Sequence, residues 1–267
     1  MSPTTEPLLT VLEAFDPIGL EATNAQAALM RRVDTKYVIR PDQLDEILPT
    51  WASTHRVLEI AGVRSSHYHN IYFDTPGLSL YHVHHAGAAS RVKFRMREYR
   101  ESNLRFYEVK ARSNKGVTDK QRAPVRGATS LPDWLDQASI DYPRHLYGES
   151  IQETIQIDYD RITLVSKTGA ERVTIDRNLQ FRSGDRWVEL PDWIVVELKQ
   201  ERAAPSSIVG QFRARGIRSG SISKYCLGIL HLFPEVKRNR FKLPLRILDK
   251  QLRNHGIAAS RGGSLEA

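Results

Sequence analysis

Lysine and arginine recur at alternate positions of several short segments, and this spacing gives the first indication of chemistry. In RVKFRMREY, residues 91–99, basic side chains alternate with Val92, Phe94 and Met96. Successive side chains of a β-strand point to opposite faces, so this segment would present one basic face and one apolar face. A row of guanidinium and ammonium groups can bind the oxygens of a phosphate chain through charge-assisted hydrogen bonds.

The same alternation occurs in other segments. Twelve cations fall on such faces or in SISKY near the end of the chain: Arg32, Lys36, Lys93, Arg95, Arg97, Lys110, Lys120, Arg122, Arg161, Arg172, Lys199 and Lys224. Only four carboxylates accompany them: Asp34, Glu108, Asp176 and Glu197. A half-buried sheet with its charged face in water is one explanation. Exposed strands usually mix both signs of charge, however, so the basic surplus favours an enclosed face that binds an anion.

If the sheet curls with its apolar side outward beneath helices, its basic side lines a lumen. Like charges crowd one another there and lose hydration, and a bound polyanion would relieve both effects. The few carboxylates are then explained as ligands of a hard divalent cation that also binds phosphate oxygens. Residue types and spacing therefore predict a channel for a linear phosphate chain.

The elements that must position these side chains are predicted to be mainly strands. Alternation of period two predicts strands over 31–39, 67–74, 91–100, 104–112, 118–126, 154–165, 171–177 and 193–200. Helical spacing and end signals predict helices over 21–30, 41–53, 131–139 and 204–216. Short connections between many successive strands indicate an antiparallel, meander-like sheet in an α+β fold.

Composition limits the class of protein. The 267 residues carry a formal net charge of +8, which favours anionic partners. No apolar run approaches the roughly 18 residues that a membrane helix needs, and the N-terminal residues lack a secretory signal pattern. The single cysteine, Cys226, excludes an internal disulfide and fits a reducing, cytoplasmic location.

Eight motifs, in this order along the chain, carry a family resemblance: RRVDTKYVI, IYFDTPGLSLY, KFRMREY, FYEVKAR, DYDRITL, RVTIDRNL, VVELK and SISKY. They resemble VTC domains, the catalytic domains of vacuolar transporter chaperone polyphosphate polymerases, within the triphosphate tunnel metalloenzyme (CYTH-like) group. The resemblance implies an eight-stranded antiparallel β-barrel tunnel with flanking helices, which binds nucleoside triphosphate and polyphosphate with Mn²⁺ or Mg²⁺. It divides the chain into a lead-in with a short helix (1–29), a tunnel domain (30–234) and a basic C-terminal helix and flexible tail (235–267).

The resemblance also assigns roles to individual residues. Those expected to act in catalysis are Arg95, Arg97, Lys110, Arg161 and Lys224. Those expected to bind substrate are Arg32, Lys36, Lys93, Lys120, Arg122, Arg172, Lys199 and Ser223. Glu197 resembles the metal-binding glutamate, with Asp34, Glu108 and Asp176 as further candidates. Asp34 stands where the wider group often has glutamate, which shortens the reach of this carboxylate by one methylene.

The function expected on these grounds is metal-dependent synthesis of polyphosphate from ATP, with transfer of the γ-phosphate to a growing chain and release of ADP. A triphosphatase that uses water as acceptor, and a non-catalytic polyphosphate-binding protein, are alternatives with the same residues. Nucleic-acid binding is disfavoured, because Tyr37, Phe94 and Tyr107 fall on the parity opposite the cations. His82, His84 and His85 could suggest a transition-metal site, although no cysteine lies near them. The basic tail 236–256 predicts a solvated helix, with docking to a membrane surface or a protein as a second interpretation.

Overall fold

The computed structural model of the chain describes residues 5–28, 32–115, 117–125, 127, 130–137, 150–201, 206–220 and 223–253. The helices are α1 (Thr5–Glu13), α2 (Leu20–Ala28), α3 (Pro41–Ile47), α4 (Ser79–Ala86), α5 (Leu131–Gln137), α6 (Ser207–Ala214), α7 (Lys224–Leu232) and α8 (Asn239–Arg253), with 3-10 turns at Leu48–Trp51 and Arg100–Ser102. The strands are β1 (Asp16–Ile18), β2 (Arg32–Ile39), β3 (His55–Leu58), β4 (Ser66–Asp74), β5 (Arg91–Tyr99), β6 (Leu104–Arg112), β7 (Thr118–Pro124), β8 (Gln152–Ser166), β9 (Glu171–Ser183), β10 (Arg186–Leu190), β11 (Ile194–Glu201) and β12 (Ser219–Gly220).

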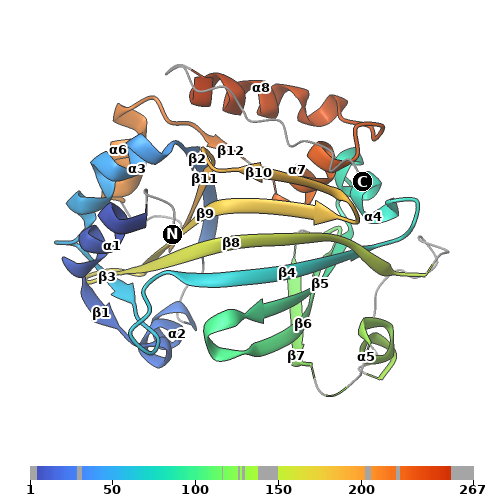
Figure 1. Cartoon of the computed structure of the whole chain (residues 1–267), viewed down its shortest axis with the longest axis horizontal. Coiled ribbons are helices and arrows are strands. Elements are labelled where there is room, and N and C mark those ends of the chain that lie inside the picture. The colour runs from blue at the N-terminus through green and yellow to red at the C-terminus, as the bar shows by residue number, and fades with distance from the viewer. Residues whose placement is uncertain are drawn as a thin grey trace.

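One sheet contains all twelve described strands, with the main order β12-β2-β11-β9-β8-β4-β5-β6-β7 (Figure 1). Every neighbour on this path is antiparallel, as predicted, and each of the eight predicted strands is present. The expected antiparallel tunnel with flanking helices is present, although backbone hydrogen bonds do not close the barrel in the described part of the chain. Within the described residues β7 and the two-residue β12 are the ends of the path and do not pair with each other. The tunnel is therefore a curled sheet with an open seam.

Apolar faces of the sheet lie outward beneath helices, as the alternation predicted. One core joins β2, β8, β9 and β11 to α1, α3 and α6, and includes Ile175, Val196 and Phe212. Another core joins β5 and β6 to α5, and includes Phe94 and Leu135. In Figure 1, α1, α3 and α6 gather at one end of the molecule, and α5 lies beside β6 and β7. The opposite, polar faces of these strands are thereby turned toward the inside of the curl.

A third core lies on the inner side, where α7 packs against β8, β9 and β10. The contact is close because Gly228 has no side chain: a Cβ atom at this position would lie 2.3 Å from Ile155 Cδ1 and 2.5 Å from Phe181 Cδ1. Seven of the nine α7 residues are buried. Such a helix shows no amphipathic periodicity, which explains why sequence patterning missed it.

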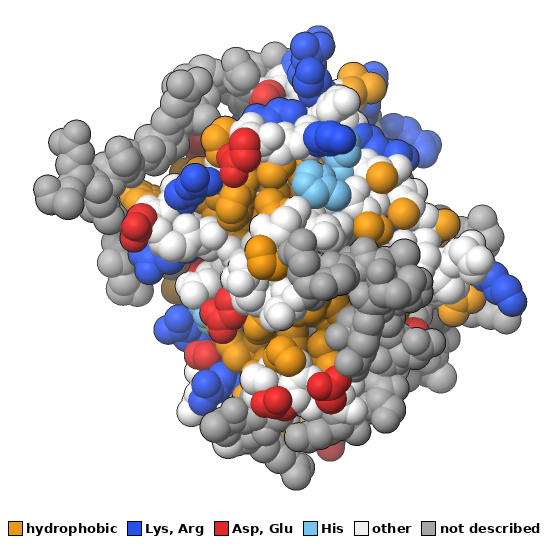
Figure 2. Space-filling view, turned by 90° about the vertical axis from the view of Figure 1, so that its right-hand side faces the viewer, with side chains coloured by type: hydrophobic (Ala, Val, Ile, Leu, Met, Phe, Trp, Pro, Cys, Tyr) orange, Lys and Arg blue, Asp and Glu red, His pale blue; other side chains and the backbone are white. Residues whose placement is uncertain are grey.

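The basic C-terminal helix α8 runs along the top of the molecule (Figure 1). Its beginning is attached to α4: Tyr81 Oη donates to the Lys237 carbonyl at 2.6 Å, and Phe241 packs against Tyr81 and His85. Figure 2 shows lysine and arginine side chains gathered at the top of the adjoining face. Among the described helices, none combines the length and apolar character needed to cross a membrane.

Candidate functional site

The inner faces of the strands surround a cavity of about 850 Å³. Side chains from β2, β4, β5, β6, β7, β8, β9 and β11 line it, together with residues at β12, α7 and Pro244 of α8. Fifteen residues expected from the sequence are among them: Asp34, Lys36, Lys93, Arg95, Arg97, Glu108, Lys110, Lys120, Arg122, Arg161, Arg172, Glu197, Lys199, Ser223 and Lys224.

Two expected site residues are not placed in this lining. Asp176 is fully buried behind it. Arg32 belongs to β2, but its side chain lies outside the described residues. A further lining cation, Arg218, was missed by sequence reasoning. Arg218 directly precedes the two-residue strand β12. The sequence around it has no alternation of period two, so patterning could not identify it.

The basic surplus of the chain is concentrated in this cavity. Twelve lysine and arginine side chains line it, against three carboxylates. The cavity thus carries nine more basic than acidic groups, while the whole chain has a formal net charge of +8. The remainder of the chain is consequently close to charge balance. A broad basic outer surface of the kind that binds nucleic acid is not required to explain the net positive charge.

Strand register arranges part of the cavity wall in layers. Lys93, Lys110 and Lys120 are aligned across β5, β6 and β7. Two residues further along each strand, Arg95, Glu108 and Arg122 are aligned in the same way. We call the first row the lysine layer and the second the arginine layer. Lys93 and Lys110 make no ion pair or hydrogen bond with other side chains in the described part of the protein.

Hydrogen bonds hold Arg95 of the arginine layer and Arg97 of the next row. Arg95 Nε donates to Glu108 Oε2 at 2.5 Å, and Arg95 Nη1 donates to Tyr72 Oη at 3.1 Å. Burial opposes ionisation of Glu108, but the charges of Arg95 and Arg97 outweigh it and lower the pKa of this carboxyl. Arg97 is 8% exposed and donates from Nε to Asn70 Oδ1 at 3.0 Å. These arginines are therefore fixed before any ligand binds.

In the lysine layer, the pKa values of Lys93 and Lys110 are lowered. Partial burial, followed by repulsion from Lys120, Lys36 and Lys93, lowers the pKa of Lys110 to about 8. Burial likewise lowers the pKa of Lys93. Both shifts arise first from burial, to which repulsion from neighbouring cations adds, and an anion bound between the two lysines would oppose them.

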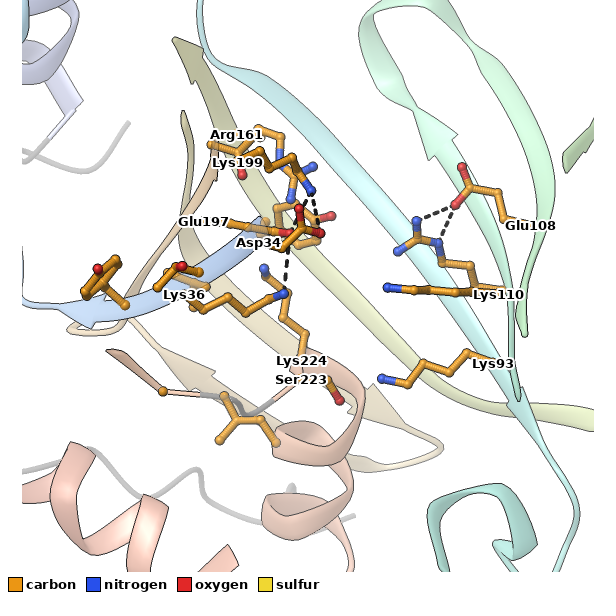
Figure 3. A pocket seen from close by; sticks show the side chains of 18 of the residues that line it. Asp34, Lys36, Lys93, Glu108, Lys110, Arg161, Glu197, Lys199, Ser223 and Lys224 are labelled. Atoms are coloured by element: carbon orange, nitrogen blue, oxygen red, sulfur yellow. Dashed lines mark hydrogen bonds and ion pairs between the residues drawn. The ribbon is translucent and has the colours of Figure 1, made fainter. Parts of the chain in front are cut away.

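Glu197 and Asp34 face the lysine layer from β11 and β2 (Figure 3). Lys199 Nζ donates to Glu197 Oε1 at 2.7 Å and lies 3.5 Å from Asp34 Oδ2, while Lys36 Nζ lies 3.4 Å from Glu197 Oε1. Burial opposes ionisation of Glu197, yet Lys36 and Lys199 hold the pKa of this carboxyl well below its usual range. The Glu197 carboxylate is therefore ionised at neutral pH.

A buried carboxylate supports the adjoining wall. Asp176 Oδ1 accepts a hydrogen bond from Arg161 Nε at 2.5 Å, and Oδ2 accepts one from Arg161 Nη2 at 2.7 Å and another from Lys224 Nζ. Burial opposes ionisation, but Arg161 and Lys224 lower the pKa of Asp176 below its ordinary value. Tyr159 packs beneath both cations, 5.2 Å from Arg161 and 4.7 Å from Lys224. Asp176 positions two cavity cations.

Ser223 has a structural contact of its own. Its Oγ accepts a hydrogen bond from the Cys226 backbone N–H at 3.2 Å and so caps the N-terminus of α7. The cap sets the beginning of the helix, so that Lys224 follows directly at its first turn and reaches Asp176. Cys226 is buried beside them, in agreement with its apolar surroundings in the sequence.

The histidines noticed in the sequence lie outside the cavity lining. His82, His84 and His85 belong to α4, where His85 packs against Phe241. His67 Nδ1 lies 2.9 Å from Asp160 Oδ1, and His69 Nδ1 lies 2.9 Å from Asp158 Oδ1, between β4 and β8. Across the described residues, no three histidine, cysteine, aspartate or glutamate side chains are grouped so that they could hold a metal ion by themselves.

The carboxylates of the cavity fit a metal shared with a ligand better than an all-protein metal site. Asp34 and Glu197 both lie close to the Lys199 ammonium, so their oxygens occupy one small region. Magnesium is commonly held by one or two carboxylates together with substrate phosphates and waters. Glu108 is committed to Arg95, and Asp176 to Arg161 and Lys224. This donor set singles out Asp34 and Glu197 as candidates.

Comparison with solved structures finds matches of low sequence identity. A candidate adenylate cyclase from Bacillus halodurans is 11% identical, with 76% of this chain and 98% of that chain covered and a TM-score of 0.47. PH1819 from Pyrococcus horikoshii OT3 is 12% identical, with coverage of 74% and 97% and a TM-score of 0.41. HpAC1 from Hippeastrum, described as having a dominant triphosphatase activity, is 13% identical, with coverage of 73% and 94% and a TM-score of 0.39.

No curated protein matches the chain. The model of the VTC domain family, in contrast, matches residues 31–233. This match spans well over half of the sequence and contains every strand that lines the cavity. The chain therefore belongs to the VTC domain family.

Proposed function

We propose that the protein binds a linear chain of phosphates in the cavity and transfers a phosphoryl group within it, making polyphosphate from ATP. The observation that carries the proposal is the lysine layer: Lys93 and Lys110 face a cavity that has nine more basic than acidic groups, and neither has an acidic partner in the described residues. A polyphosphate supplies closely spaced oxygens that match such an array. Membership of the VTC domain family supports the same chemistry.

The contacts of each cation suggest how it would bind phosphate. Arg95 and Arg97 are fixed by Glu108 and Asn70, and their remaining N–H groups can bind phosphate oxygens without reorganisation. Arg161 and Lys224 are held by Asp176 on the adjoining wall. The flexible lysines can follow successive phosphates as the chain shifts. Catalysis would consist mainly of alignment and charge neutralisation.

The attacking group needs no protein base. A terminal phosphate oxygen of the growing chain is already ionised at neutral pH, and its attack on the γ-phosphorus of ATP would release ADP. This agrees with the cavity lining, whose carboxylates are each engaged by a lysine or arginine in the described structure. Water as acceptor would instead give orthophosphate at the same site.

Glu197, with Asp34, would hold a divalent cation such as Mn²⁺ or Mg²⁺. When bound, that cation would neutralise charge on the phosphate oxygens and polarise them for transfer. Glu197 suits this role because its pKa is lowered by Lys36 and Lys199 despite burial, so the carboxylate is ionised over the whole neutral range.

The test incubates the purified chain with ATP and Mn²⁺, and separately with tripolyphosphate, and resolves polymer length, ADP and orthophosphate. Formation of long chains with ADP is expected. Orthophosphate alone would assign a triphosphatase, and binding without turnover would assign a binding protein. Glu197→Gln should abolish metal-dependent turnover but leave the fold intact. Glu189→Gln, an exposed glutamate on β10, is the matched control and should keep full activity.

A further inference from the structure

The layered wall continues beyond the arginine layer with a change of side-chain type. The next row along β5 and β6 pairs Arg97 with Phe106, and the one after it pairs Tyr99 with Leu104. Phe106 has the same parity on β6 as Glu108 and Lys110, so it lies on the inner face of the sheet. The inner wall therefore runs from lysine through arginine to aromatic residues.

Phe106 forms a stack with a residue of the cavity lining. The guanidinium of Arg122 lies 4.0 Å from the centre of the Phe106 ring. Tyr99 meets that ring edge-on, with ring centres 6.0 Å apart and planes at 83°. Phe106 is only partly buried and belongs to none of the three hydrophobic cores of the described residues. An aromatic ring held in this way, but outside a core, offers a flat surface next to a phosphate-binding wall.

We propose that Phe106 and Arg122 form the platform for the nucleobase of a nucleoside triphosphate, whose phosphates point toward the lysine layer. The inference rests on the proposed function, because it names the part of the same cavity that takes the nucleoside. Bases stack readily on aromatic rings and on guanidinium planes. The four residues from Phe106 to Lys110 span about 13 Å along the strand, enough to separate a base from the last of three phosphates.

This arrangement gives the cavity a direction. The nucleoside occupies the aromatic end, and the inorganic chain extends past Lys93, Lys110 and Lys120. An alternative role for Phe106 is to hold Arg122 in place for phosphate binding. The two roles differ in one measurable respect: only the platform role depends on the ligand having a base.

The experiment measures the affinity of the full chain for two triphosphate esters by calorimetry. ATP carries a base, and methyl triphosphate does not. In Phe106→Leu, affinity for ATP should fall roughly tenfold, as expected for the loss of one stacked base. Affinity for methyl triphosphate should be unchanged. Trp187→Ala removes an exposed aromatic residue of β10 and is the matched control, with both affinities unchanged.

Two results would overturn the platform while leaving the proposed function in place. One is an equal loss of affinity for both ligands in Phe106→Leu. The other is a wild-type protein that binds methyl triphosphate as tightly as ATP. Failure of the wild-type protein to bind either ligand or tripolyphosphate would overturn the proposed function itself, and the platform with it.

Discussion

Replacing Asp176 by asparagine should destabilise the protein strongly even when no metal and no ligand are present. The Asp176 carboxylate is 0% exposed and accepts three hydrogen bonds from two cations. Asparagine has nearly the same shape but no charge. It would leave Arg161 and Lys224 close together without their counter-ion.

The size of the effect follows from the burial of this group. Removal of one partner from a buried ion pair typically lowers the free energy of unfolding by about 3–5 kcal/mol. For a chain of this size, each kcal/mol shifts the midpoint of thermal unfolding by roughly 2–4 °C, so a fall of about 6–20 °C is expected. Asp185→Asn, in an exposed turn between β9 and β10, should change the free energy of unfolding by less than about 0.5 kcal/mol.

Urea unfolding of both variants and the wild-type protein in EDTA would measure the difference. Because the folded pKa of Asp176 is lowered, its stabilising contribution is present at neutral pH and is lost as pH falls through the folded pKa, below 3.8. The curves of wild type and Asp176→Asn should therefore converge in acid. Equal urea midpoints at neutral pH would refute the reasoning, and loss of metal binding alone would make Asp176 a metal ligand instead.

Three further predictions concern the cavity and helix α7. Lys93→Met should weaken tripolyphosphate binding roughly tenfold, as expected for the loss of one charged hydrogen bond. The unfolding temperature of this variant should stay the same or rise, because burial already disfavours the Lys93 charge, and a large loss of stability in thermal unfolding would contradict this. Affinity for tripolyphosphate, measured by titration calorimetry, should decrease as pH rises above about 8, because the Lys110 ammonium then loses its proton, and the decrease should be shallower in Lys110→Gln. Gly228→Ala should lower the free energy of unfolding by about 1–3 kcal/mol, because its methyl group would overlap Ile155 and Phe181, and an unchanged urea midpoint would show that these side chains can move aside.

Sequence patterning located the cavity wall because parity alone decides which face of a strand a residue occupies. Lys93, Arg95 and Lys110 were placed on the inner face in this way, without knowledge of strand order. Parity does not show, however, whether a side chain on the inner face lines the cavity or is buried behind the lining. Asp176 shares a face with cavity residues, but its pairing with Arg161 across β8 and β9 places it behind the lining, and this register depends on tertiary contacts.

Arg218 and helix α7 could not be predicted from sequence periodicity. Arg218 lies in a connection, and the buried helix α7 is apolar on most sides, so neither shows the spacing on which such predictions depend. The family resemblance implied a β-barrel, but alternation within single strands does not show whether the two end strands of a sheet pair. Within the described residues the sheet ends at β12, which has only two residues.

The open seam has a mechanical consequence. Backbone hydrogen bonds fix the spacing of paired strands at about 4.8 Å, but within the described residues no such bonds join β7 to β12 or β2. The distance between Lys120 on β7 and Lys36 on β2 is therefore set by side-chain forces and by the bending of the sheet. We expect mutual repulsion of the cations to widen this side of the cavity, and a bound anion to draw the two strands together. The width of the tunnel would then depend on the charge density of the bound chain.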